Sequence, residues 1–272
     1  MMFDLGRLLA LTPAVKAFLR GHNPFDTLFF RDRRAFSEGS DTLTEIWGSY
    51  GPGGELLALL KLASERSAER CYVLWDKQEA LSPFMRLVKG RYAQVRTSGQ
   101  ARQIEPWLAR FHPGEIMFRQ QGDARVLTKR AFRPRRFPGI RKAGLEDIER
   151  VLWLFPTDPK AARVRLKDAI EHATVFVLQV NGQIVSTART DVEMPGAAHV
   201  AGVATHPAFQ NKGYATYCTA ALCEDVLTRC ERIFLAYAVG NDAAGRVYGK
   251  IGFVPLPERR VRARLRFGSQ WN

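Results

Sequence analysis

The feature that most constrains this chain is the succession of a strand, a tight loop and a helix between His199 and Tyr217. An apolar run ends at Pro207, and a loop that contains Gly213 leads into a helical pattern. The first N–H groups of a helix have no partner within it, and the helix dipole adds partial positive charge there. Because glycine lets a ligand approach the backbone closely, this segment predicts a binding site for an anion such as a diphosphate.

The spacing of apolar residues around this loop predicts a domain of mixed strands and helices. Helices are expected at residues 146–155, 159–172, 214–229 and 242–251. Strands are expected at residues 140–143, 174–180, 183–190, 198–205, 232–239 and 261–267. Asn181 and Gly182 form a strong signal for a two-residue hairpin turn between two of these strands.

The loop resembles the Q/R-x-x-G-x-G/A motif that binds acetyl-CoA in the GNAT superfamily of N-acyltransferases, with Gln210, Gly213 and Ala215 at the three defining positions. The V-x-T-x-P sequence at residues 203–207 resembles the family's strand that carries the pantetheine arm. Residues 241–253 resemble a second family segment, N-x-x-A-x-x-x-Y-x-x-x-G-F. Two such matches in the expected order identify the C-terminal half as similar to this superfamily.

The resemblance covers roughly residues 138–267 and implies an α/β fold with a mixed, mostly antiparallel sheet flanked by helices. It implies acetyl-CoA as co-substrate and direct transfer of the acetyl group to a primary amine. The residues that it places along the pantetheine arm and acyl group are Val203, Ala204 and Thr205. Those that it places around the pyrophosphate are Gln210, Asn211, Lys212, Gly213, Tyr214, Ala215 and Thr216.

Two further roles follow from the second segment. The resemblance implies that Tyr248 donates a proton to the departing CoA thiolate, and a phenol with a pKa of about 10 is protonated at neutral pH. Simple packing on an amphipathic helix is the competing interpretation of this tyrosine. Asn241 is expected to begin the following helix as its N-cap, and the resemblance adds a contact with the pantetheine arm.

The general base is the least defined part of the site. An attacking ammonium must lose a proton before it can react, and many members of the family carry a glutamate on the fifth strand for this purpose. Residues 232–239 offer no carboxylate. Glu193 is therefore the predicted base, with Asp191 and His199 as alternatives, and each of the three would also suit an ordinary surface position.

The basic, proline-containing segment at residues 129–139 predicts a boundary between domains at 1–130 and 138–272. In the N-terminal half, residues 51–54 predict a hairpin turn, residues 70–75 a strand and residues 103–111 a helix, so a second α/β domain is expected. A degenerate GNAT-like unit is one interpretation of this half. Because residues 95–100 lack the full loop motif, such a unit is not expected to bind CoA.

The chain is strongly basic, with 41 Lys and Arg against 27 Asp and Glu and a formal net charge of +14. This charge favours an anionic ligand or partner, such as a nucleotide cofactor, RNA or an acidic protein. Arg262, Arg264 and Arg266 share one face of the last expected strand, where they would meet an acidic substrate or solvent. A nucleic-acid role is disfavoured, because no recognisable binding module accompanies the basic residues. The alternative to an enzyme is a non-catalytic protein that senses acyl-CoA or docks on RNA or an acidic protein.

The remaining composition narrows the class of protein. The four cysteines, Cys71, Cys218, Cys223 and Cys230, fit neither zinc-site spacing nor a disulfide framework, so buried thiols are expected. The histidines show no ligand spacing, and no metal is expected. No apolar run approaches the roughly 20 residues that cross a bilayer, and no secretory signal is recognisable at the N-terminus. The expected location is the cytoplasm.

Overall fold

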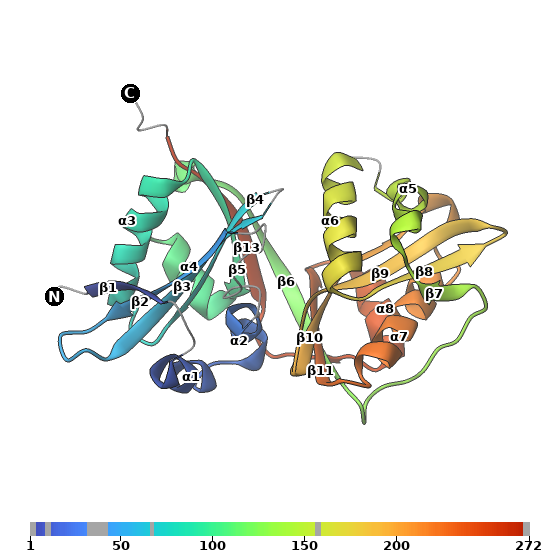
Figure 1. Ribbon diagram of the computed structural model, residues 1–272, viewed down its shortest axis with the longest axis horizontal. Coiled ribbons are helices and arrows are strands. Elements are labelled where there is room, and N and C mark those ends of the chain that lie inside the picture. Colours follow the sequence, from blue (N-terminus) through green and yellow to red (C-terminus); the bar gives the residue numbers. More distant parts are fainter. Residues whose placement is uncertain (1–3, 9–11, 32–42, 66–67, 156–158, 269–272) are drawn as a thin grey trace. The chain divides into compact units, whose positions relative to one another are not determined.

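The computed structural model describes residues 4–8, 12–31, 43–65, 68–155 and 159–268. The chain forms two compact units (Figure 1): unit 1 contains residues 1–122 and 258–272, and unit 2 contains residues 123–257. A single boundary was expected between residues 130 and 138, whereas the structure changes unit inside a strand and returns to unit 1 at the end of the chain. The alternation of apolar residues shows which face of a strand is buried but does not show which strand it pairs with.

Unit 2 is built on a mixed sheet in the order β7-β8-β9-β10-β11-β6, with β12 paired to β6. Its strands are β7 (Ile140–Lys142), β8 (Val175–Val180), β9 (Gln183–Met194), β10 (Gly196–Thr205), β11 (Cys230–Ala238), β12 (Val254–Pro255) and the second half of β6 (Ile116–Thr128). Its α-helices are α5 (Ile148–Leu152), α6 (Pro159–His172), α7 (Tyr214–Val226) and α8 (Asp242–Ile251). Strands β7 to β10 pair antiparallel, and β10 pairs parallel with β11. The element order and the mostly antiparallel sheet predicted for this region are confirmed.

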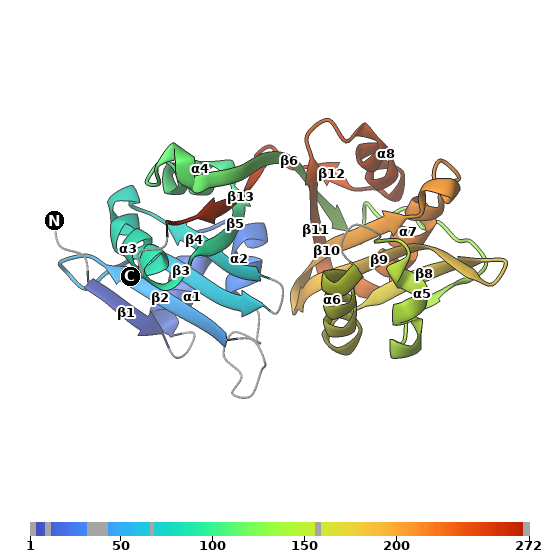
Figure 2. The same ribbon diagram turned by 90° about the horizontal axis from the view of Figure 1, so that it is seen from above.

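Helices cover both faces of the unit 2 sheet, with α5 and α6 on one side and α7 and α8 on the other (Figure 2). In β8, Val177 packs into the α5–α6 core and its neighbour Leu178 packs into the α7–α8 core. Successive side chains of a strand point to opposite faces, so one strand supplies both cores. This two-sided burial explains the continuous apolar run at residues 175–178, where a half-exposed strand would alternate.

The segment at residues 129–139 is part of unit 2. The N–H of Arg133 donates to the carbonyl of Ile251 at 2.8 Å, and the N–H of Gln179 donates to the carbonyl of Gly139 at 2.9 Å. Phe132 and Phe137 pack against the α7–α8 core. Its prolines and glycine therefore reflect an irregular but packed conformation, not a free linker.

Unit 1 repeats the element order of unit 2, and its sheet has the order β1-β2-β3-β4-β5-β13-β6. Its strands are β1 (Asp4–Leu8), β2 (Leu43–Tyr50), β3 (Leu56–Glu65), β4 (Ala68–Trp75), β5 (Gln94–Gln100), the first half of β6 and β13 (Arg260–Arg266). Its α-helices are α1 (Pro13–Arg20), α2 (Pro24–Arg31), α3 (Ser82–Arg91) and α4 (Ala101–Leu108). The last strand of the chain thus lies between β5 and β6 in the unit formed mainly by the N-terminal half.

None of the helices in the described parts of the chain combines the length and the apolar character that crossing a membrane requires. The expected cytoplasmic location is not tested by this finding.

A buried carboxylate joins β7 to α5 in unit 2. Asp147 has no exposed surface, and it accepts two hydrogen bonds from Arg141, at 2.5 and 2.7 Å, and one from the N–H of Gly144 at 3.0 Å. The hydrogen bonds from Arg141 lower the pKa of Asp147 below its usual value. Burial acts in the opposite direction but has a smaller effect. The charged carboxylate therefore stabilises the folded state.

We expect Asp147→Asn to lower the free energy of unfolding by about 2 kcal/mol at neutral pH, because hydrogen bonds to a charged group are lost. The folded pKa is lowered, so this contribution is complete above the ordinary carboxyl pKa and disappears as the pH falls through the folded value. Urea unfolding at pH 7 and at about pH 3 measures the difference, which should shrink at the lower pH. Asp168→Asn, at an aspartate whose side chain is 55% exposed, is the control and should have little effect at either pH. Equal midpoints for Asp147→Asn and the parent at neutral pH would contradict the assignment.

Candidate active site

The two parallel strands of unit 2 separate partway along their length. β10 pairs with β11 from Gly196 opposite Cys230 to His199 opposite Phe234. Within the described residues, no register continues beyond this point, although β10 runs on to Thr205. Backbone N–H and C=O groups need partners, so the diverging edge of β10 can pair with a ligand that has amide groups of its own.

A bulge shapes the diverging half of β10. Its register with β9 shifts between Ala201 and Ala204, and Gly202 within the bulge has a φ of 59°. The positive φ favours glycine here, and a Cβ would lie 2.5 Å from Nε of Arg189, whose side chain would have to move. Bulges of this kind redirect a strand next to a binding site. The bulge lies at the start of the residues expected along the pantetheine arm.

Side chains fix the end of β10 where it enters the loop. The hydroxyl of Ser186 donates to the carbonyl of Ala204 at 3.0 Å, and the amide of Gln210 donates to the carbonyl of Thr205 at 3.2 Å. These hydrogen bonds fix the backbone of β10 next to the split, at Ala204 and Thr205. Val203 precedes these two residues. Gln210, the first residue of the motif, has a structural role in joining the loop to the strand.

The loop after β10 leads directly into α7. Asn211 and Gly213 have φ values of 62° and 83°, and α7 begins at Tyr214. Gly213 is the N-cap without a side-chain hydrogen bond, and the first turn of α7 contains no acidic residue. The N–H groups of this turn therefore retain their capacity to donate, and the helix dipole adds positive potential. The seven residues expected around the pyrophosphate form one continuous loop and first helical turn, whose geometry would suit an anion.

Aromatic side chains surround the loop. The ring of Trp153 stacks on His206 with centroids 3.8 Å apart, and Phe209 lies 6.2 Å from Trp153. Nζ of Lys212 lies 5.3 Å from the Phe209 ring, which places the cation on this cluster. Trp153 follows α5, about 50 residues before the loop, so nothing in the motif itself pointed to it. His206 accepts a hydrogen bond from Ala208 N–H within a short 3-10 turn.

Tyr248 on α8 is largely buried, with 8% of its surface exposed. Its ring lies 5.6 Å from that of Tyr237, which belongs to the diverging half of β11. Burial raises the pKa of Tyr248 to about 12, so the phenol stays protonated throughout the neutral range. The structure thus places a protonated hydroxyl-bearing side chain beside the split, in the core beneath α7 and α8.

Asn241 begins α8 as its N-cap, as expected. Its side-chain oxygen accepts a hydrogen bond from the N–H of Ala244 at 3.1 Å.

The sequence did not point to Arg125, whose Nε donates to the Tyr237 hydroxyl at 2.8 Å and whose Nη1 donates to the carbonyl of Phe253 at 3.2 Å. Because Arg125 comes from β6, only the folded unit reveals its contact with Tyr237.

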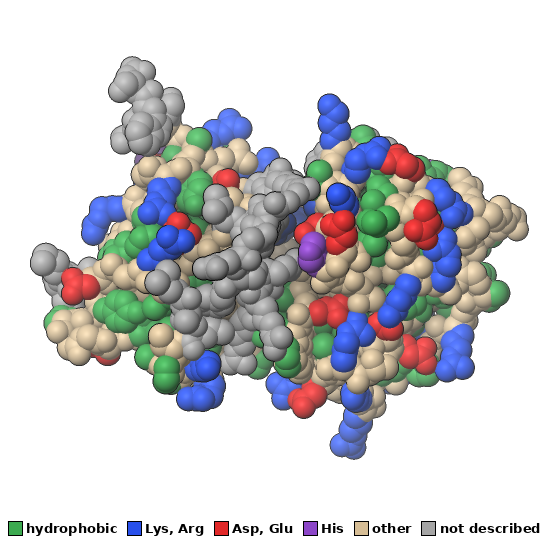
Figure 3. Space-filling view, in the orientation of Figure 1, with side chains coloured by type: hydrophobic (Ala, Val, Ile, Leu, Met, Phe, Trp, Pro, Cys, Tyr) green, Lys and Arg blue, Asp and Glu red, His purple; other side chains and the backbone are tan. Residues whose placement is uncertain are grey.

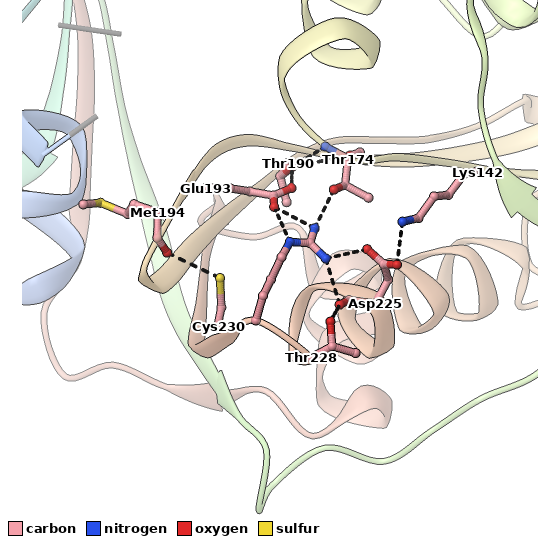
Figure 4. Close-up of polar contacts among 9 residues, drawn as sticks. Lys142, Thr174, Thr190, Glu193, Met194, Asp225, Thr228 and Cys230 are labelled. Atoms are coloured by element: carbon pink, nitrogen blue, oxygen red, sulfur yellow. Dashed lines mark hydrogen bonds and ion pairs between the residues drawn. The ribbon is translucent and has the colours of Figure 1, made fainter. Parts of the chain in front are cut away.

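Glu193 is held in an ion-pair network at the far end of β9 (Figure 4). One carboxylate oxygen accepts from Thr190 Oγ1 at 2.6 Å, and the other accepts from Nε and Nη2 of Arg229 at 2.9 and 2.6 Å. Arg229 also binds Asp225 at 2.7 Å. Burial raises the pKa of Glu193, but these hydrogen bonds outweigh it, and the net shift is downward. This network stabilises the junction of β9 and α7, and it makes Glu193 a weaker proton acceptor.

The two alternatives to Glu193 lie together. Nδ1 of His199 is 2.6 Å from the Oδ1 of Asp191, and the His199 side chain is 15% exposed. His199 occupies the last paired position of β10 before the split.

Unit 1 has a corresponding split, and the side chain of Gln103 binds the strand edge there. β4 and β5 pair only at Arg70 opposite Arg96 and Cys71 opposite Thr97. Gln103 accepts from the Trp75 N–H at 3.1 Å, and the Trp75 indole donates to the Gln103 carbonyl at 3.0 Å. The amide of Gln103 therefore binds the backbone of β4, where β10 of unit 2 presents an open edge.

The loop of unit 1 that corresponds to the anion-binding loop also differs. It comprises residues 76–81 between β4 and α3 and has no glycine, whereas residues 95–100 belong to β5. Arg110 occupies this loop, donating to the Gln78 carbonyl and the Ser82 hydroxyl, both at 2.5 Å. Among the described residues of unit 1, this loop therefore lacks the glycine, and Gln103 binds the strand edge at Trp75.

The cysteines do not resemble reactive thiols. All four are buried, and burial raises their pKa values, that of Cys71 to about 12.

In the described part of the chain, no group of three or more potential ligands is placed to hold a metal. Lys and Arg are interspersed with Asp and Glu on the face shown in Figure 3, so that face carries no single basic patch. Of the arginines on β13, Arg262 is hydrogen-bonded to Gln120 at 2.9 Å.

Comparisons with known proteins agree with this geometry. Residues 143–253 match the family model described as the acetyltransferase (GNAT) family. A GCN5-related N-acetyltransferase from Sphaerobacter thermophilus has a similar structure, with a TM-score of 0.63, 17% identity, and coverage of 97% of this chain and 95% of that one. A tandem GNAT protein from the clavulanic acid biosynthesis pathway gives a TM-score of 0.59 at 13% identity, and the similarity covers 99% of this chain and 100% of that one. A GNAT-family acetyltransferase from Colwellia psychrerythraea gives a TM-score of 0.60 at 12% identity, and the similarity covers 97% of this chain and 100% of that one. The search of curated proteins returns no match.

Residues 143–253 therefore form a GNAT acetyltransferase domain. The structural similarity extends over nearly the whole chain, and the two units share the same order of elements.

Proposed function

We propose that unit 2 transfers an acetyl group from acetyl-CoA to a primary amine. The observation that supports this most strongly is the combination of an open β10 edge with a glycine-dependent loop at the start of α7. A thioester with two amides in its arm and a diphosphate at its other end complements both features. Unit 1, with its split filled by Gln103, would bind no acyl-CoA.

In this proposal the pyrophosphate lies against the N–H groups of the loop and first turn that run from Gln210 to Thr216. The pantetheine arm extends along the β10 edge at Val203, Ala204 and Thr205, and Asn241 contacts it from the start of α8. Lys212 adds a positive charge beside the phosphates, supported by its position over Phe209. The thioester then lies in the split, near the ring of Tyr248.

The chemical step needs an acid for the leaving group. Tyr248 is protonated at neutral pH, since its pKa is raised to about 12, and it can donate its proton to the thiolate sulfur as the C–S bond breaks. No cysteine is suited to form an acyl-enzyme, which favours direct attack of the amine on the thioester. The same site without catalysis would be an acyl-CoA sensor, the second candidate, because residues 235–238, the half of β11 that diverges from β10, contain no carboxylate.

We expect Tyr248→Phe to lower kcat by about 100-fold, because general acids typically contribute 10²- to 10⁴-fold. Its affinity for CoA should stay within about twofold of the parent, because the ring packing is preserved. Release of the CoA thiol, measured with acetyl-CoA and a panel of primary amines, tests both statements together with a CoA titration by calorimetry. Tyr72→Phe, on β4 of unit 1, is the matched control and should keep the parent rate. Failure of the parent to release CoA with any amine would instead support the sensor.

A further inference from the structure

We propose that His199 is the general base of this acetyl transfer and that Asp191 positions it; the proposal rests on the function proposed above. His199 is the last residue of β10 that pairs with β11. It therefore lies where the two strands begin to separate, at the inner end of the split that would hold the thioester. A base at this point would meet the amine as it reaches the acyl carbon.

The orientation of His199 follows from its neighbours in the strand. Ala198 and Val200 both belong to the core beneath α7 and α8. Successive side chains of a strand point to opposite faces, so His199 points to the face covered by α5 and α6. Tyr248 belongs to the α7–α8 core. The acid and the base thus lie on opposite sides of the sheet. Each can reach a different atom of the tetrahedral intermediate, the base the amine nitrogen and the acid the sulfur.

Asp191 fixes the orientation and the tautomer of the His199 imidazole. Its Oδ1 lies 2.6 Å from Nδ1 of His199, and the register of β9 and β10 shifts between His199 and Val200, next to this contact. A carboxylate at one ring nitrogen fixes the ring orientation and favours the tautomer that carries its proton there. The lone pair that accepts a proton is then on Nε2. Asp191 acts through His199 and is a positioning residue.

Glu193 does not offer the same geometry. It pairs with Ala198, so its side chain lies on the α7 face of the sheet, opposite to His199. Its carboxylate is bound by Arg229 and Thr190. To accept a proton, Glu193 would have to lose the charge that holds this network together.

The step balances with these two residues alone. The amine nitrogen forms a bond to the acyl carbon while its proton passes to Nε2 of His199. The C–S bond then breaks, and the sulfur takes the proton of the Tyr248 hydroxyl. The products are an acetamide and the free thiol of CoA. The extra proton on His199 and the missing proton on Tyr248 are equal in number, and exchange with water restores both residues.

Several charged groups lie on the elements around His199, so the pH dependence must be compared between variants. They are Arg189, Asp191 and Glu193 on β9, Glu231 and Arg232 on β11, and Lys160, Arg163, Arg165, Lys167, Asp168 and Glu171 on α6. Only a step in the profile that disappears with His199 reports on His199 itself.

The test measures kcat/KM between about pH 5.5 and 9 for the parent, His199→Gln and Asp191→Asn, using acetyl-CoA and the best amine found in the panel. In the parent, kcat/KM should rise with pH to a plateau as the base loses its proton. His199→Gln should lower the plateau by about 100-fold and remove the step. Asp191→Asn should lower it by about 10-fold and displace the step, because the imidazole loses its charged partner. Affinity for CoA should be unchanged in both.

His172→Gln is the matched control. His172 on α6 also lies beside an aspartate, with Nδ1 3.5 Å from Oδ1 of Asp168, but its side chain is 52% exposed and it belongs to a helix, not to the separating strands. It should keep the parent rate and the parent profile.

Three outcomes separate the proposals. If His199→Gln keeps both the rate and the pH step, the base is another group, while the acetyltransferase proposal stands. If the two variants lose stability and rate equally at every pH, the His199–Asp191 pair is structural, and the proposal for the base fails. If the parent binds CoA but never releases thiol with any amine, the proposed function fails and this inference fails with it.

Discussion

Gly213→Glu is expected to abolish CoA binding, with affinity at least about 100-fold below that of the parent. Gly213 has a φ of 83° and caps α7 without a side chain of its own. Any other L-residue is strained by roughly 1 kcal/mol at this angle, and a carboxylate would occupy the position where the diphosphate is proposed to bind. The new charge would itself satisfy the N–H groups and the dipole, so the repulsion of the phosphates adds to the strain.

Calorimetric titration with CoA measures this effect. The parent should bind one CoA per chain because, in the part of the chain that the structure describes, unit 2 combines the diverging strand edge with the glycine-containing loop. Gly196→Glu is the matched control, since Gly196 also has a positive φ, of 86°, and a Cβ there meets nothing within 4 Å. It lies at the other end of β10 and should leave binding intact. If Gly213→Glu binds CoA as tightly as the parent, the loop is not the diphosphate site, and the roles proposed for Tyr248 and Asn241 lose their basis.

Ending the chain after Pro257 should unfold unit 1, although the deletion removes none of its first 122 residues. β13 lies between β5 and β6 and pairs with both. Its side chains Val261, Ala263 and Leu265, with Phe267 after it, are buried in the core of unit 1. Burying four such side chains contributes on the order of 5 kcal/mol or more, which is comparable to the stability of a whole domain.

Hydrogen exchange followed by mass spectrometry gives the clearest measurement, because it resolves the two units. Protection should be lost in β3, β4 and β5 and kept in β8, β9 and β10, whose contacts lie within unit 2. A chain that ends after Gly268 keeps β13 and is the control. Unchanged protection of unit 1 in the chain that ends after Pro257 would show that β13 is not needed for its fold.

The sequence predicted the local structure of unit 2 well because its signals are short-range. Asn181 and Gly182 form the expected turn, with φ values of 48° and 78°, and α6 and α8 begin and end at the expected residues. Helices and turns depend on residues close together along the chain, and these residues carry the necessary caps and glycines.

For the same reason, the sequence located the loop of the candidate site but did not decide which residue is the base. The loop from Gln210 to Thr216 is contiguous, so a motif describes it completely. The choice among Glu193, Asp191 and His199 depends on which face of the sheet each side chain occupies and on Arg229, more than 30 residues away. A bulge and a register shift determine those faces, and neither leaves a recognisable pattern in the sequence.

By itself, the sequence determined the family resemblance, the order of strands and helices in the C-terminal half, and the position of the glycine-containing loop before α7, because each depends on neighbouring residues. Only the tertiary structure decided that the last strand completes unit 1, that Gln103 fills the split of that unit, and that His199 and Asp191 meet at the split of unit 2. These features are contacts between segments that are distant along the chain or shifted in register. The free energy of such contacts depends on the packing of the folded units, which local periodicity does not specify.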